Sequence, residues 1–108
     1  MNTPANLSPD HQLARAFHVG NLPAMRAWLA VGTSQDARND LLDAALFGYR
    51  MTPSHASCSK HATAARLLVD AGATTEIPWI GTTARFLADL RATSPAAKAA
   101  SIEGRGRL

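Results

Sequence analysis

The stretch Ala64-Ala-Arg-Leu-Leu-Val-Asp-Ala-Gly-Ala73 has a similar copy earlier in the chain. When Gly72 is aligned with Gly32, it falls on Ala24-Met-Arg-Ala-Trp-Leu-Ala-Val-Gly32, with apolar residues at matching positions and an arginine in the same place. Both segments have helical apolar spacing and end at a glycine, which can close a helix in the left-handed conformation without a Cβ penalty. The pattern predicts two equivalent short amphipathic helices.

A second, shorter pattern precedes each of these helices. Leu13-Ala-Arg-Ala-Phe-His-Val-Gly20 matches Leu41-Leu-Asp-Ala-Ala-Leu-Phe-Gly48, with a leucine, two adjacent apolar residues and a glycine at the same spacing. Each unit is therefore predicted to be helix, glycine, helix, glycine. Gly20 and Gly32 are 12 residues apart, whereas Gly48 and Gly72 are 24 apart. The second unit is thus predicted to carry an insertion, residues 49–60.

Local signals place the helix ends and the buried faces. Ser8, Pro9 and Asp10 form an N-cap, a proline at the first helical position and a first-turn acid, which predicts a helix over 9–19. Pro23 sets the next helix start at Asn21 or Leu22. The second helix is predicted to bury Leu22, Met25, Trp28 and Leu29. A third helix, capped by Asp36, Asn39 or Asp40, is predicted to bury Leu41, Leu42, Ala45 and Leu46. A fourth helix, near 62–71, is predicted to bury Ala64, Ala65, Leu67 and Leu68.

Composition favours an all-α fold and excludes several classes of protein. Hydrophobic residues make up 46% and aromatic residues 6%, and the rich alanine content suits closely packed helices. The net charge is +3, but the basic residues are scattered, so we do not expect nucleic-acid binding. A single cysteine cannot form an intrachain disulfide, and no apolar run is long enough to span a membrane. We therefore expect a cytoplasmic protein, and the alanine and arginine usage is typical of a bacterium.

The C-terminal residues 101–108 are expected to stand apart from the domain. Ile102-Glu-Gly-Arg105 resembles the recognition sequence of the clotting protease factor Xa, a common element of expression vectors. We interpret this segment as a tag-derived or disordered tail.

The two-unit pattern resembles the ankyrin repeat family, whose repeats read Thr-Pro-Leu-His-x-Ala-Ala-x-x-Gly-His and then Val-Val-x-Leu-Leu-Leu-x-x-Gly-Ala. Residues 64–73 and Leu41-x-x-Ala-Ala-x-x-Gly48 match best, and Gly81-Thr-Thr-Ala-Arg-Phe-Leu-Ala88 resembles the opening of a third repeat. Ser94 and Pro95 would cap a final short helix over 96–100. The resemblance implies a single domain over 1–100. It would be a short solenoid of stacked antiparallel helix pairs, with degenerate repeats at about 10–32, 40–72 and 81–100 and finger loops at 33–40 and 74–80.

A second register of the same family pattern is open. Thr52-Pro-Ser-His-Ala-Ser57 itself resembles a repeat opening, which would make the helix over 41–47 the inserted element. We prefer the first register because residues 54–60 lack the leucine stripe that a packed helix needs.

The resemblance implies a non-enzymatic module without a cofactor that binds another protein through its concave face and fingers. Self-association is a further way for so short a stack to complete its core. Trp28 is expected in the core. Candidate contact residues for the partner are Arg38, Tyr49, Arg50, Met51, Glu76, Trp79 and Ile80.

An alternative function is metal binding or thiol chemistry at His55, Cys58 and His61. Imidazole and thiolate are zinc ligands, but on a helix these positions would turn by about 60° per step and converge poorly. In an irregular loop they could converge. Asp36, Asp40 and Asp43 are interpreted as capping and first-turn charges, and no phosphate-binding or zinc-protease signature occurs.

Overall fold

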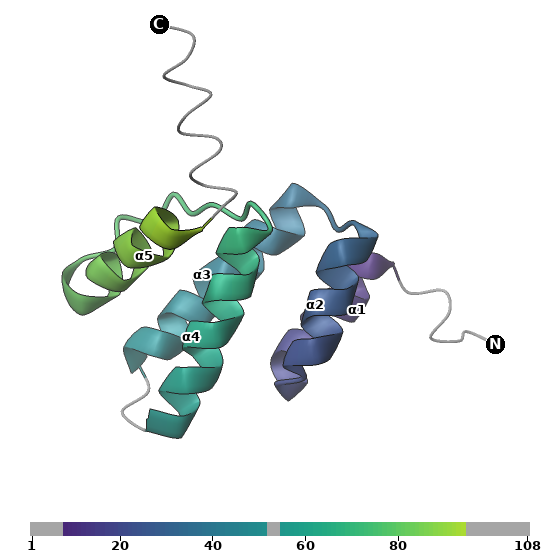
Figure 1. Ribbon diagram of the computed structural model, residues 1–108, viewed down its shortest axis with the longest axis horizontal. Helices are drawn as coiled ribbons and strands as arrows, with labels where there is room; N and C mark the ends of the chain where they lie inside the picture. The colour runs from purple at the N-terminus through teal and green to yellow at the C-terminus, as the bar shows by residue number, and fades with distance from the viewer. Residues whose placement is uncertain (1–7, 52–54, 95–108) are drawn as a thin grey trace, which may run out of the picture.

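The computed structural model describes residues 8–51 and 55–94, and within these ranges the chain forms helices and loops without a strand. Figure 1 shows two helix pairs side by side and a fifth helix on the far side of the second pair. The helices are α1 (Pro9–Val19), α2 (Leu22–Val31), α3 (Gln35–Met51), α4 (His55–Asp70) and α5 (Gly81–Thr93). The predicted final helix over 96–100 and the tail lie outside the described residues.

The first helix pair has the ends that its sequence predicts. The Ser8 hydroxyl accepts a hydrogen bond from the backbone N–H of His11, and Pro9 begins α1. Gly20 has φ 76° and closes α1, because its N–H donates to Phe17 O while the N–H of Asn21 donates to Ala16 O. Asn21 then caps α2, one residue after α1 has been closed.

Each helix of the first pair lies against one helix of the second pair. Besides the contacts within each pair, α1 contacts α3 and α2 contacts α4, while α5 contacts both helices of the second pair. One core joins all five helices. It contains Leu13, Ala16, Met25, Leu41, Leu42, Ala45, Leu46, Ala64, Ala65, Leu68, Val69, Ala73, Leu87 and Leu90. The predicted stripes are therefore confirmed as the core faces, with Leu22, Trp28, Leu29 and Leu67 partly buried at the edge of the core.

The third helix is longer than predicted at both ends. Ser34 caps it by accepting a hydrogen bond from the N–H of Ala37 at 3.1 Å, so most of the predicted finger 33–40 is helical. At the other end α3 continues through Gly48 to Met51. The prediction that Gly48 closes the helix is wrong, since Gly48 lies inside α3 where the ring of His61 packs against it.

The fourth helix absorbs most of the rest of the predicted insertion. It begins at His55 rather than near residue 62, so residues 49–51 and 55–60 extend α3 and α4. The described residues of the additional length between Gly48 and Gly72 thus belong to two longer helices, which pack against each other. Among the described residues, none of the helices combines the length and apolar character needed to cross a membrane.

A loop over residues 71–80 connects α4 to α5 and is fastened to the start of α3. The Asn39 side chain accepts hydrogen bonds from the N–H of Thr74 at 2.7 Å and from Gln35 Nε2 at 2.8 Å. Gln35 Nε2 also donates to Gly72 O at 2.8 Å. These bonds fix the loop beside α3, so that the loop and one side of α3 form a common surface.

Candidate functional site

One side of α3 faces away from the core and borders the loop over residues 74–80. Asp36, Asp40, Asp43, Phe47 and Met51 recur every three or four residues, a spacing that places them on one face of a helix. The buried leucines of α3 lie on the opposite face. We call this surface, together with loop residues 74–80 and the start of α5, the α3–loop face.

An aromatic pair lies in the middle of the α3–loop face. The rings of Phe47 and Trp79 meet edge to face, with their centroids 4.9 Å apart. The indole N–H of Trp79 donates to Thr75 Oγ1 at 3.1 Å, which fixes the ring. Trp79 is partly buried against the core, whereas Phe47 keeps 47% of its surface exposed. The pair therefore presents an ordered apolar surface to the outside.

Next to the aromatic pair, toward the end of α3, is a hollow of about 460 Å³, here called the Ile80 hollow. Its lining residues are Tyr49, Arg50, Ile80, Thr82 and Thr83. The Tyr49 ring stacks on Phe86 with centroids 4.2 Å apart, which anchors the end of α3 to α5. Ile80 remains 74% exposed, and Met51, which follows Arg50 in the chain, is 72% exposed. Three of the sequence-predicted contact residues, Tyr49, Arg50 and Ile80, thus line one hollow.

On the other side of the aromatic pair, toward the start of α3, is a hollow of about 360 Å³, here called the acidic hollow. It is lined by Asp36, Asn39, Asp40, Asp43, Thr74, Thr75 and Glu76. The chain has eight acidic residues in all, and four of them lie here. Because α3 begins at Gln35, Asp40 and Asp43 lie beyond its first turn. Their interpretation as capping or first-turn charges is therefore wrong.

Ile80 occupies a position that usually carries a different kind of residue. It is the N-cap of α5, with φ −131° and ψ 162°, and it makes no side-chain capping hydrogen bond. Serine, threonine, aspartate and asparagine are preferred there because their side chains satisfy a free N–H of the first helical turn. Ile80 also contributes little to the core, since it is 74% exposed. Neither capping nor packing accounts for this side chain.

Arg38 does not join the other predicted contact residues. Its guanidinium donates to Thr33 O, to Thr33 Oγ1 at 3.2 Å and to Gln35 Oε1 at 3.1 Å. The side chain is partly buried, and these bonds hold it at the corner between α2 and α3. The remaining predicted contact residue, Glu76, is exposed and lines the acidic hollow.

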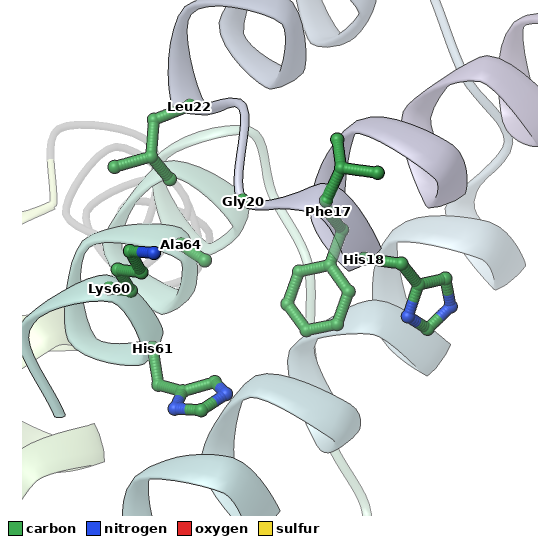
Figure 2. Close-up of a pocket in the computed structure, with 8 residues that line it drawn as sticks. Phe17, His18, Gly20, Leu22, Lys60, His61 and Ala64 are labelled. Atoms are coloured by element: carbon green, nitrogen blue, oxygen red, sulfur yellow. The ribbon is translucent and has the colours of Figure 1, made fainter. Parts of the chain in front are cut away.

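The predicted His55, Cys58 and His61 set falls within α4 and not in an irregular loop. The side chains of residues 55–59 lie outside the described part of the structure, so a site that includes them stays a prediction. His61 lines a separate hollow of about 150 Å³, together with Phe17, Leu22 and Lys60 (Figure 2). Figure 2 shows the rings of Phe17 and His61 on two sides of this hollow, from α1 and α4. Within the described residues, no three His, Cys, Asp or Glu side chains are grouped as metal ligands.

The acidic hollow is the part of the site that sequence reasoning missed. The spacing of Asp36, Asp40 and Asp43, which places them on one helix face, is the sequence signal that could have identified this hollow. Glu76 could not be added from sequence, because the loop that carries it reaches α3 through the bonds of Asn39. Comparison of the chain with protein-family models, curated proteins and solved structures finds no match. The site is therefore interpreted from its geometry.

Proposed function

We propose that this chain is a non-enzymatic protein-interaction module, built as a short ankyrin-like stack, that binds a segment of a partner protein on the α3–loop face. The stacking of α1 on α3 and of α2 on α4 supports the repeat interpretation. The helices of the second pair, with 17 and 16 residues, are longer than the 11- and 10-residue helices of the first. In this proposal the second repeat is enlarged, and its additional turn carries Arg50 and Met51 to the binding surface.

The observation that carries the proposal is the exposed Ile80 at the N-cap of α5. Large apolar side chains grouped on a surface are typical of interaction sites. Ile80 directly follows Trp79, whose ring packs on the exposed Phe47, and it shares a hollow with Tyr49 and Arg50. Departures from local structural preference concentrate at functional positions, where stability is exchanged for activity. An isoleucine that neither caps its helix nor fills the core is best explained by contact with a partner.

The substitution Ile80→Ser tests this proposal because it should move stability and binding in opposite directions. A serine supplies the missing N-cap hydroxyl, so the free energy of unfolding should rise by about 0.5–1 kcal/mol. Partner binding should weaken by at least about tenfold, because an exposed apolar anchor is lost. Stability is measured by urea unfolding. Binding is measured by affinity capture from the source cells, with each recovered partner then titrated against both proteins.

The matched control is Val31→Ser, which removes an exposed apolar side chain, 64% accessible, at the end of α2. It should leave partner binding unchanged. If Ile80→Ser and wild type bind every recovered partner equally well, the α3–loop face is not the binding surface.

A further inference from the structure

We infer that the partner segment is basic at one end and apolar at the other, with its basic end in the acidic hollow. This inference rests on the proposed function and adds the chemistry of the ligand. The apolar surface at Phe47, Trp79 and Ile80 can anchor a partner, but it does not distinguish one apolar partner from another. The charges beside this surface supply the distinction.

The carboxylates of the acidic hollow lack cationic partners within the described residues. Asp36, Asp40 and Asp43 on α3 and Glu76 on the loop line this hollow, and no lysine or arginine of the described chain forms an ion pair with them. The positive N-terminal end of α3 stabilises Asp36 in the first turn, but the effect falls off beyond that turn. Asp40, Asp43 and Glu76 thus concentrate negative charge at this hollow, although the whole chain has a net charge of +3.

Asp43 is the residue that joins the acidic hollow to the aromatic pair, and its two carboxylate oxygens are not equally exposed. Oδ1 is shielded from solvent and has no hydrogen-bond partner among the described residues. A lysine or arginine of a bound segment would pair with the Asp43 carboxylate where it lines the hollow. Asp43 lies one turn from Phe47, so a segment that reaches Asp43 also reaches the aromatic pair.

The rise of α3 sets the spacing expected in the partner. Seven residues separate Asp40 from Phe47 and eleven separate Asp40 from Met51, which correspond to about 10 and 16 Å along the helix. An extended peptide advances about 3.3 Å per residue. Basic and apolar residues of an extended partner should therefore lie roughly three to five positions apart. Arg50, at the Ile80 hollow, opposes the reverse orientation, in which the basic end would lie there.

The acidic hollow is preformed in the unbound chain. The hydrogen bonds from Thr74 N–H to Asn39 and from Gln35 to Gly72 fix the loop against α3, and the bond from Trp79 to Thr75 fixes the aromatic ring. A preformed site loses less conformational entropy on binding than a mobile one. A short segment is therefore a sufficient ligand.

The test is selection from a displayed library of random peptides, about twelve residues long, against the immobilised full chain. The selected peptides should carry lysine or arginine roughly three to five positions from an apolar residue. A synthetic selected peptide should lose about tenfold in affinity between about 50 and 500 mM NaCl. The double substitution Asp40→Asn with Asp43→Asn should cause a similar loss. Asp89→Asn, an exposed control on α5, should leave the affinity unchanged.

Failure of this inference is distinguishable from failure of the proposed function. Selected peptides that are acidic or uncharged, or whose affinity is insensitive to salt and to Asp40→Asn with Asp43→Asn, would overturn the basic partner. If those peptides still lose binding to Ile80→Ser, the interaction surface stands. If no selected peptide depends on Ile80, the interaction surface and the basic partner are both rejected. Circular dichroism of each variant verifies that the helices are intact.

Discussion

Gly48 lies inside a helix, where glycine is normally unfavourable, and its neighbour explains its presence. A Cβ atom at this position would fall closer than 3.0 Å to Cδ2, Cε1 and Nε2 of the His61 ring on α4. The absent side chain thus lets the His61 ring pack on the backbone of α3. A residue that looks like a helix terminator in the sequence is instead a point of close approach between two helices.

The substitution Gly48→Ala should therefore destabilise the fold, although an alanine inside a helix usually stabilises it. The added methyl group displaces the His61 ring, and overpacking of this kind costs about 1–3 kcal/mol against a helix-propensity gain of about 0.5–1 kcal/mol. In a His61→Ala background the obstacle is gone, and the same change should stabilise by about 0.5–1 kcal/mol. Urea unfolding of the four proteins measures both effects. Equal effects of Gly48→Ala in the two backgrounds would contradict the packing argument.

At the scale of elements, a carboxylate links the starts of α1 and α3. Asp10 Oδ1 in the first turn of α1 accepts a hydrogen bond at 2.7 Å from the N–H of Ser34, the residue that caps α3. The Ser34 backbone and hydroxyl hydrogen bonds lower the pKa of Asp10 below its ordinary value of 3.8, with smaller contributions from Arg38 and His11. Partial desolvation opposes this shift. The ionised form of Asp10 is therefore the one that favours the folded chain.

Because the pKa of Asp10 is lower in the folded state, its contribution to stability is present above pH 3.8 and is lost as the pH falls through the folded value. Asp10→Asn should lower the urea midpoint at pH 7 and should reduce the further loss on acidification toward pH values below 3.8. Urea unfolding of both proteins across this pH range measures the difference. An equally large acid-induced loss in wild type and variant would show that Asp10 does not carry this dependence.

At the scale of the whole molecule, one buried cluster joins all five helices, and α3 lies at its centre. Leu42 and Leu46 are completely buried on α3, which contacts α1, α4 and α5. Helices that share one core in this way are expected to unfold together. The two tryptophans can test this, because Trp28 is on α2 and Trp79 is on the loop before α5.

The substitution Leu46→Ala should lower the free energy of unfolding by about 2–5 kcal/mol, because it leaves a cavity in the shared core. Fluorescence of Trp28 and of Trp79, observed separately in the Trp79→Phe and Trp28→Phe backgrounds, should report the same urea midpoint as circular dichroism. Val31→Ala, at an exposed position, should change stability by less than about 0.5 kcal/mol. Two separated midpoints would instead show that the helix pairs unfold independently.

The sequence predicts well what neighbouring residues decide. The ends of α1 follow from Ser8, Pro9 and Gly20, whose capping acts within one turn, and the buried stripes follow from apolar spacing. The start of α3 was missed although Ser34 caps it locally. Its far end was missed because Gly48 looks like a terminator in the sequence, whereas in the fold it lies under the His61 ring of another helix. For the candidate site too, residue type predicted some members and the fold brought in the others. Ile80 and Tyr49 were recognised by residue type, whereas the acidic hollow depends on a loop fastened 35 residues away at Asn39.

The position of α3 links folding to recognition. One face of α3 carries the central core leucines, while the opposite face carries the acidic hollow and Phe47 of the aromatic pair. A ligand held by the second face binds the folded chain in preference to the unfolded one and must raise its melting temperature. At a ligand concentration of about one hundred times Kd, the gain is about 2.7 kcal/mol. Thermal-shift screening of unlabelled peptides would therefore detect a ligand of any sequence that binds this face.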